Sequence, residues 1–189
     1  MNQDERMYVI KNQKIVIEKE LDVNRILDIG GGGEGVIGLC YGDKVIAIDR
    51  SKDELEESPD GPLKIVMDAS KLSFLENSFD AVTSFFTLMY ISIAEHEKIF
   101  NEIYRVLNEC GKFILWDATI PKYDNSTKDI FVIHLEVSTP DKRIETGYGV
   151  LRKDKEQDIQ YFINMGLRTG FKVIKEEIHD HTFKIIFQK

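Results

Sequence analysis

Short apolar runs alternate with amphipathic segments along most of the 189-residue chain. Five of these runs are rich in β-branched and aliphatic residues and have the length of buried strands. They lie at residues 25–29, 44–49, 63–69, 79–86 and 109–120. Strands that alternate with helical patterns are typical of a mostly parallel sheet covered by helices. The pattern therefore predicts an α/β fold with a doubly wound sheet.

The clearest helical pattern spans residues 92–107, where apolar side chains recur three and four positions apart. Ser92 and Glu95 have the spacing of a capping box at its start. We expect its single apolar stripe to cover one face of the sheet. A second amphipathic segment begins at residue 159 and ends before Gly170.

Three segments depart from the parallel pattern. Residues 171–189 indicate two strands joined by a tight turn at Asp180, which makes them antiparallel. Residues 129–152 alternate apolar and polar positions on both sides of a turn and predict a β-hairpin inserted after the fifth strand. Residues 1–20 predict a small N-terminal hairpin that turns at Asn12 and Gln13. The expected architecture is one domain, residues 1–189, with a seven-stranded sheet whose last strand is antiparallel.

The composition of the chain argues against some classes of binding partner. The formal net charge of -8 and pI near 5.1 argue against a protein that binds the nucleic-acid backbone. No apolar run reaches the length that spans a bilayer, and the first residues lack the pattern of a signal peptide. Cys40 and Cys110 fit no metal or redox spacing, so we interpret both as reduced core thiols. We therefore expect a cytoplasmic protein with neither a nucleic-acid nor a membrane partner.

A run of four glycines, residues 30–33, follows the first predicted strand and its Asp28. Asp49 and Asp68 close the next two predicted strands. In an open α/β sheet, ligands bind at the carboxyl ends of the strands, so these residues are expected at one edge. A carboxylate after the second strand can accept both ribose hydroxyl protons, and one after the third can accept from an adenine amino group. The pattern predicts an adenosine site.

A dinucleotide site is the alternative interpretation. Gly30, Gly32 and Gly35 satisfy GxGxxG, and Asp49 follows about 20 residues later, as in NAD(P)-dependent oxidoreductases. Three features weigh against it. Asp28 stands where a dinucleotide site usually has an apolar residue, Asp68 has no equivalent role in NAD binding, and the antiparallel last strand departs from the all-parallel dehydrogenase sheet.

With these residues the chain resembles the class I S-adenosylmethionine-dependent methyltransferases, a Rossmann-like family, over nearly all of residues 24–189. The resemblance implies that Asp28, Gly30 and Gly32 surround the methionine part of the cofactor. It places Asp49 at the ribose and Asp68 at the adenine, with the backbone of Ala69 nearby. Residues 79–91 and 102–117 are similar to the family's fourth-strand motif and to the helix and strand that follow.

Further cofactor contacts are predicted next to these motifs, at Gly31, Arg50, Ser84 and Phe85. One position departs from the family pattern. Glu34 stands where a third spaced glycine is often found, and Gly35 is the candidate replacement.

The acceptor site is expected beside the fourth and fifth strands. A sulfonium already carries an activated methyl group, so the protein must mainly hold the acceptor in line and exclude water. Aromatic faces also stabilise the sulfonium charge, although strand alternation sends some rings, such as Phe85 or Phe86, into the ordinary core. Tyr90, Trp116 and Tyr148 are the candidate catalytic residues of this pocket. Tyr148 lies between two glycines, which allow close approach of a ligand.

Other polar residues have simpler interpretations. His134 shares the polar side of the predicted hairpin with Glu136 and is expected to face solvent. His179 and His181 flank a hairpin turn without a Cys or a further His, so no metal site is predicted. Asp117 leaves two roles open, an acceptor contact or a loop-fixing hydrogen bond.

Absent motifs narrow the acceptor. The proline-tyrosine motifs that resemble amino-methylating nucleic-acid enzymes do not follow the fourth strand, and no Pro-Cys pair offers a cytosine-attacking thiolate. A small-molecule acceptor is the prediction. The hairpin at residues 129–152 is expected to act as a lid or as a homodimer contact. The alternative to a working enzyme is a module that binds S-adenosylmethionine without turnover.

Overall fold

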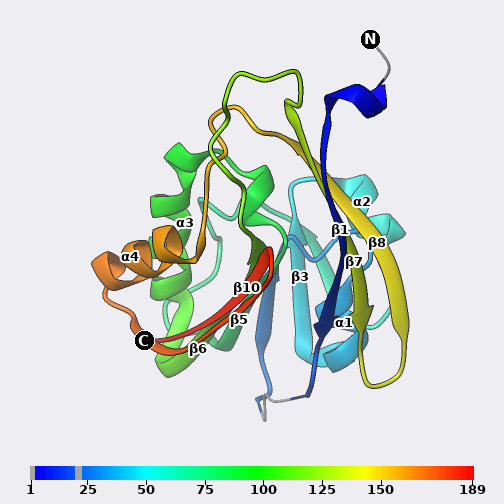
Figure 1. Ribbon diagram of the computed structural model, residues 1–189. Coiled ribbons are helices and arrows are strands. Elements are labelled where there is room, and N and C mark those ends of the chain that lie inside the picture. Colours follow the sequence, from blue (N-terminus) through cyan, green and yellow to red (C-terminus); the bar gives the residue numbers. More distant parts are fainter. Residues whose placement is uncertain (1–2, 20–22) are drawn as a thin grey trace.

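The computed structural model describes residues 3–19 and 23–189. Its main sheet has seven strands in the order β4-β3-β2-β5-β6-β10-β9 (Figure 1). In that order, their bounds are Leu63–Val66, Val45–Asp49, Ile26–Ile29, Phe79–Phe85, Leu107–Ala118, Thr182–Gln188 and Lys172–His179. The first five strands in this order, β4, β3, β2, β5 and β6, run parallel to one another. Strand β10 is antiparallel to both of its neighbours, β6 and β9. The predicted mostly parallel sheet with a reversed last strand is confirmed.

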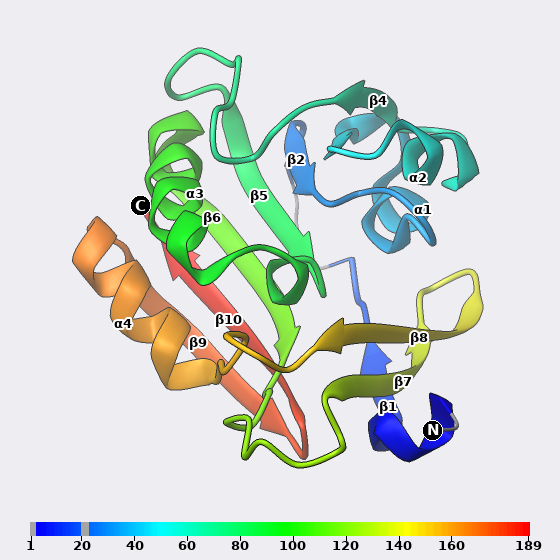
Figure 2. The ribbon, with the colours of Figure 1, turned by 90° about the horizontal axis from the view of Figure 1, so that it is seen from above.

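Helices cover both faces of this sheet. The α-helices are α1 (Val36–Tyr41), α2 (Lys52–Glu57), α3 (Ile93–Val106) and α4 (Ile159–Thr169). Short 3₁₀ helices are η1 (Gln3–Arg6), η2 (Gly42–Lys44) and η3 (Leu88–Tyr90). Seen from above, α3 and α4 lie on one side of the sheet and α1 on the other (Figure 2). Within the described ranges, no helix has both the length and the apolar character needed to cross a membrane.

A second, three-stranded sheet covers part of the face opposite α3 and α4 (Figure 2). Its order is β1 (Met7–Val16), β7 (Ile130–Ser138) and β8 (Arg143–Leu151). Strands β7 and β8 pair antiparallel, and β1 pairs parallel with β7. The apolar side of β7 is buried against the main sheet, through Phe131, Ile133, Leu135 and Val137. Because the chain itself covers this side, the alternation of residues 129–152 gives no argument for a homodimer.

The predicted N-terminal hairpin is wrong, because residues 7–16 form the single strand β1. The register with β7 shifts between Ile10 and Gln13, so the supposed turn is a bulge within one strand. Beyond the bulge, the Gln13 amide donates to Asp180 at 3.1 Å and its Oε1 accepts from the His181 amide at 3.2 Å. These two hydrogen bonds attach β1 to the β9–β10 turn. The contact joins residues far apart in sequence, so the local pattern of apolar and polar residues does not reveal it.

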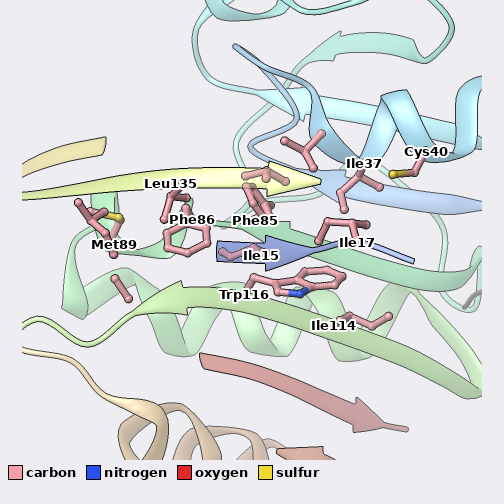
Figure 3. Close-up of a cluster of buried hydrophobic side chains, with 14 of the residues drawn as sticks. Ile15, Ile17, Ile37, Cys40, Phe85, Phe86, Met89, Ile114, Trp116 and Leu135 are labelled. Carbon is pink, nitrogen blue, oxygen red and sulfur yellow. The ribbon is translucent and has the colours of Figure 1, made fainter. Parts of the chain in front are cut away.

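The main sheet separates two apolar cores. On the α3 and α4 side the core is aromatic, with Phe100 stacked parallel to Phe162 and edge-on to Phe113. On the other side, Phe85 and Trp116 of the main sheet pack against β1, β7 and α1 (Figure 3). Burial of each large apolar side chain stabilises the fold by about 1.5–3 kcal/mol. These cores fix the strand ends that carry the site.

Two local predictions need correction. Ser92 precedes α3 as its N-cap, but its side chain makes no capping hydrogen bond. Glu95 does not close a capping box, since its carboxylate accepts from Arg50 at 2.8 Å instead. Cys40 is buried as expected, whereas Cys110 is exposed in a positive-φ position within β6. The contact with Arg50 decides the role of Glu95, and the backbone irregularity at Cys110 accounts for its exposure; the local sequence pattern shows neither.

Candidate active site

A cavity of about 770 Å³ opens at the carboxyl ends of the parallel strands. Its walls are the segments that follow β2, β3, β4 and β5, together with Gly147 and Tyr148 of β8. Most of the predicted site residues line it: Asp28, Gly30, Gly31, Gly32, Asp49, Arg50, Asp68, Ala69, Phe85, Tyr90 and Tyr148. Its size is that of an ordinary small-molecule site.

The glycine loop is held tightly by its own surroundings. Gly30 has a φ of +73°, and a Cβ there would lie 2.1 Å from Thr87 Oγ1. A Cβ on Gly32 would lie 2.6 Å from the Cβ of Glu54. The amides of Gly30 and Gly31 both donate to the carbonyl of Ile48, at 2.8 and 3.1 Å. The glycines are therefore required by the packing of the loop against β3, α2 and Thr87, in addition to any close ligand.

Asp28 is the buried acid of the site. Only 3% of the residue is exposed, and its carboxylate accepts from Thr83 Oγ1 at 2.7 Å. Burial raises the pKa of Asp28 to about 7; the Thr83 hydrogen bond lowers it, and the negative charge of Asp49 adds to the rise. Near neutral pH this carboxyl therefore changes charge, and a bound cation nearby would favour its ionised form.

Asp49, the last residue of β3, lies directly beside the glycine loop. Its Oδ1 accepts from the Ser51 amide at 2.8 Å, which orients the carboxylate. Its Oδ2 is 3.2 Å from the position that a Cβ on Gly32 would occupy. A carboxylate offers about four acceptor positions, so Asp49 keeps capacity to accept from a diol at this wall.

Asp68 and Arg50 form a charged cluster at the β4 side of the cavity. Arg50 donates to Asp68 Oδ1 and to Glu95 Oε1, both at 2.8 Å. Ser70 also donates its amide to Asp68 at 2.8 Å. Burial alone raises the pKa of Asp68, but the hydrogen bonds from Arg50 and Ser70 outweigh it and hold the pKa below its ordinary value. Asp68 is thus an ionised acceptor at this wall, and Arg50 positions it.

Aromatic rings line the opposite wall, after β5. The rings of Phe86 and Tyr148 stack at 5.6 Å between centroids with 25° between planes, and Tyr90 meets Tyr148 edge-on at 6.4 Å. Phe86 has a φ of +49°, an uncommon conformation for a residue with a side chain. The Tyr90 hydroxyl accepts from the Gly149 amide at 3.1 Å. Strand β8 is therefore tied to the segment that follows β5.

Glu34 links this aromatic wall to the glycine loop. Its two carboxylate oxygens accept from the hydroxyls of Thr146 and Tyr148, the latter at 3.1 Å. Burial and the charge of Glu34 raise the pKa of Tyr148 well above its ordinary range, so its hydroxyl keeps its proton. The sequence marks Glu34 only as a departure from a glycine pattern; its partners lie more than 100 residues away.

Asp117 has the loop-fixing role rather than an acceptor contact. Its carboxylate accepts from the Met89 amide at 3.2 Å, from the Ala118 amide at 2.8 Å and from Gln157 Nε2 at 2.8 Å. Burial raises the pKa of Asp117 to about 7 against the effect of these hydrogen bonds. By holding η3, Asp117 positions Tyr90 in the cavity wall. Lys155 adds a second tie, donating to the Tyr90 carbonyl at 2.8 Å.

Two predicted site residues lie outside the cavity. Trp116 packs between β6 and β1, beside Ile15 (Figure 3), because the three-stranded sheet covers its face of the main sheet. Ser84 lies on the strand face opposite to its neighbour Phe85, since successive side chains of a strand alternate. It is fully buried, and its Oγ has no hydrogen-bond partner among the described residues.

His179 ends β9, and His181 lies between Asp180 and the start of β10. Within residues 3–19 and 23–189, no group of three or more His, Cys, Asp or Glu side chains is arranged to hold a metal ion.

The cavity wall is strongly acidic. One basic residue among those lining it, Arg50, is paired with two of the acids. The acidic residues in the wall are Asp28, Glu34, Asp49, Glu54, Glu57, Asp68 and Glu95. Glu54 and Glu57 belong to α2, whose acidic run has the pattern of an ordinary solvated helix. Their place in the wall follows from the packing of α2 on the glycine loop, which sequence reasoning missed.

The fold and the cavity define a Rossmann-like α/β protein with a ligand site at the carboxyl edge of its sheet. Residues 27–115 match the family described as "Methyltransferase domain". A solved S-adenosylmethionine-dependent methyltransferase from Methanosarcina mazei has the same fold, with a TM-score of 0.65 and 20% identity over 89% of this chain and 93% of that one. The family match and the shared fold support a class I S-adenosylmethionine-dependent methyltransferase and indicate S-adenosylmethionine as its cofactor.

Two curated methyltransferases are similar to part of this chain. The phosphoethanolamine N-methyltransferase of Plasmodium falciparum is 29% identical over 60% of this chain and 46% of its own length. The ubiquinone/menaquinone biosynthesis C-methyltransferase of Desulfotalea psychrophila is 30% identical over 64% of this chain and 51% of its own. The chain spans about half the length of these relatives.

Proposed function

We propose that this protein transfers a methyl group from S-adenosylmethionine to a small-molecule acceptor. The observation that carries the proposal is the convergence of Asp28, Asp49, Asp68 and the glycine loop on one cavity of about 770 Å³. The relatives named above act on small acceptors of different chemistry, a phosphorylated amine in one case and a quinone precursor in the other. The class of acceptor, a small molecule, is supported by both.

The residues present fit the cofactor. Asp49 has acceptor capacity for the ribose hydroxyls, and the ionised Asp68 can accept from the adenine amino group beside the Ala69 backbone. Asp28 and the glycine loop face the same space, where a carboxylate would orient a cationic amino group. When bound, S-adenosylmethionine supplies a methyl group already activated by its sulfonium.

The remaining work of this chain is positioning. Phe85, Phe86, Tyr90 and Tyr148 line one wall of the cavity, where their rings exclude water and form an aromatic surface suited to positive charge. The hydrogen bonds of Glu34 and Asp117 hold Tyr148 and the η3 segment in place, so the wall exists before a ligand arrives. Such preorganisation lowers the entropic cost of aligning an acceptor with the methyl group.

Isothermal titration with S-adenosylmethionine, with its demethylated product S-adenosylhomocysteine and with NADH tests the cofactor assignment. We expect both adenosyl compounds to bind and NADH to give no heat. Binding of NADH without either adenosyl compound would overturn the proposal in favour of a dinucleotide-dependent oxidoreductase. Transfer of radiolabelled methyl from the cofactor to a pool of small metabolites then tests turnover; binding without any labelled product would favour a non-catalytic module.

A further inference from the structure

We propose that the methyl acceptor is an amine, recognised by the carboxylate of Glu34 within the wall formed by Phe86, Tyr90 and Tyr148. The inference rests on the proposed function, because it names the acceptor of the same cavity. Its basis is a juxtaposition: a carboxylate on the glycine loop lies in hydrogen-bond contact with an aromatic wall that faces the cofactor cavity.

The charge of the cavity selects against anionic acceptors. Among the described residues, seven acids and one cation line it, and that cation, Arg50, already donates to Asp68 and Glu95. A phosphate or carboxylate on the acceptor would therefore enter a negative field without a free cationic partner in the described wall. Placing like charges beside one another is unfavourable. A neutral or cationic molecule meets no such penalty, and a cation is attracted.

Glu34 has the hydrogen-bonding capacity that an amine requires. Its oxygens accept one hydroxyl each, from Thr146 and Tyr148. A carboxylate has about four acceptor positions, so two remain after these bonds are made. The two hydroxyls fix the carboxylate in one orientation, and an N–H group of the acceptor can donate to it without displacing either. A hydrogen bond from an ammonium group to a carboxylate is among the stronger kinds in proteins.

The rings beside Glu34 favour the same chemistry. Phe86 and Tyr148 stack on each other, and Tyr90 stands edge-on to Tyr148. Aromatic faces attract ammonium groups and pack the apolar body of a ligand. Hydrogen bonds at both hydroxyls hold the two tyrosines, from Tyr148 to Glu34 and from the Gly149 amide to Tyr90. These hydrogen bonds order the wall before a ligand binds. A small amine with an apolar body therefore binds without a large entropic cost of ordering the two tyrosines.

Three probes that share one ring and differ in the head group test the inference: benzylamine, benzyl alcohol and benzyl phosphate. Each is titrated calorimetrically into the protein saturated with S-adenosylhomocysteine. We expect benzylamine to bind about tenfold more tightly than benzyl alcohol, since its hydrogen bond to Glu34 is charge-assisted. Benzyl phosphate should give no heat. Absence of benzylamine binding, or equal or tighter binding of either other probe, overturns the inference.

The variant E34Q keeps the size of the side chain and removes its charge. We expect the affinity for benzylamine to fall about tenfold, to that of benzyl alcohol, while benzyl alcohol changes by less than about twofold. E57Q is the matched control, because it removes one negative charge from the same cavity at α2. An equal loss in both variants would assign the preference to the general field rather than to Glu34 and overturn its role.

Binding of S-adenosylhomocysteine separates the possible failures. If the wild-type protein binds neither adenosyl compound, the proposed function fails. If it binds S-adenosylhomocysteine and does not prefer benzylamine, only the acceptor inference fails. Retained affinity of E34Q for S-adenosylhomocysteine shows that its cavity is intact. If E34Q does not fold, the order of the three probes on the wild-type protein still decides whether the acceptor is an amine.

Discussion

The two ends of the cavity are built in different ways. At the β3 and β4 end, Asp49 is the last residue of β3 and Asp68 lies two residues after β4. Each is oriented by an amide two residues later in the chain. At the β5 end, Tyr90 is held by Gly149 and Tyr148 by Glu34, over sequence separations of 59 and 114 residues. The first end is local in sequence, and the second exists only because β8 crosses it.

This difference separates the two tasks of the site. The local end carries the glycine loop and the acids at the strand ends, which line the proposed cofactor site. The long-range end depends on the three-stranded sheet, in which β1 and the β7–β8 hairpin join. We therefore expect changes at the first end to affect cofactor binding and changes at the second to affect the acceptor and the local stability of β8.

The largest expected effect belongs to the local end. D49A removes the carboxylate that we propose accepts two ribose hydroxyl protons, so it should weaken S-adenosylhomocysteine binding by about 2–4 kcal/mol, or about 30- to 1000-fold. Isothermal titration measures this loss. D53A is the matched control, since Asp53 is an exposed acid in the first turn of α2. Wild-type affinity in D49A would mean that the nucleoside end lies elsewhere.

The ionised carboxylate of Asp28 should lower the free energy of unfolding while it strengthens the binding of the cofactor. Its pKa is raised from 3.8 to about 7 in the folded protein. Between about pH 4 and pH 7 the folded state holds a proton that the unfolded state has released, so the free energy of unfolding falls as the pH rises through this window. Below pH 4 both states are protonated, and above pH 7 both are ionised.

The variant D28N removes this titration. It should be more stable than the wild type above pH 7 by about 2–4 kcal/mol in urea unfolding of the ligand-free protein, with the advantage vanishing near pH 4. The slope due to Asp117, whose pKa is also about 7, remains. At pH 8 D28N should bind S-adenosylmethionine more weakly, because it lacks the negative charge that we propose orients the cofactor's cationic amino group. Identical pH slopes in both proteins would contradict the burial argument.

A smaller effect is expected at the long-range end. Y148F keeps the ring stacked on Phe86 and removes the hydroxyl that donates to Glu34, so urea unfolding should show a loss of about 0.5–1.5 kcal/mol. The affinity for S-adenosylhomocysteine should change by less than about twofold, since Glu34 keeps its hydrogen bond from Thr146 and the glycine loop keeps its hydrogen bonds to Ile48. A large loss of cofactor affinity would show that the two ends are coupled.

The smallest effect is expected for Arg50. Its guanidinium and its two carboxylate partners are substantially exposed, with the Arg50 side chain at 51%. Exposed ion pairs contribute about 0–1 kcal/mol, so R50A should lower the free energy of unfolding by less than about 1 kcal/mol, and less still at high salt. Thermal unfolding in low and high salt measures this. A loss of several kcal/mol would show that the cluster is structural.

The parallel core of the fold could be predicted because each of its strands has a recognisable pattern in its own short stretch of sequence. Residues 26–29 and 45–49 are mostly apolar strands; the first is followed by Gly30, and the second ends in Asp49 at the carboxyl edge. The rule that strand ends of a parallel sheet meet at one edge then brings Asp28, Asp49 and Asp68 together without any knowledge of side-chain contacts. Alternation also predicts the β7–β8 pair, since its apolar positions have a period of two.

Partners distant in sequence explain what could not be predicted. A bulge and a turn look alike along residues 7–16 until β7 supplies the pairing strand. Trp116 has the same position on its strand as a site residue, but β1 covers its face. Glu95 has capping-box spacing, yet Arg50 offers its carboxylate a charged donor. In each case the local pattern allows two outcomes, and a contact from another element selects one.

By itself, the sequence determined the doubly wound sheet, its reversed last strand and the acids at its carboxyl edge, because hydrophobic period and strand order act over short stretches of chain. The tertiary structure alone decided which rings face the cavity and gave Glu34 its partners on β8. Those contacts join residues that are neighbours only after two sheets have packed face to face, and their geometry depends on burial and hydrogen bonding across the whole fold.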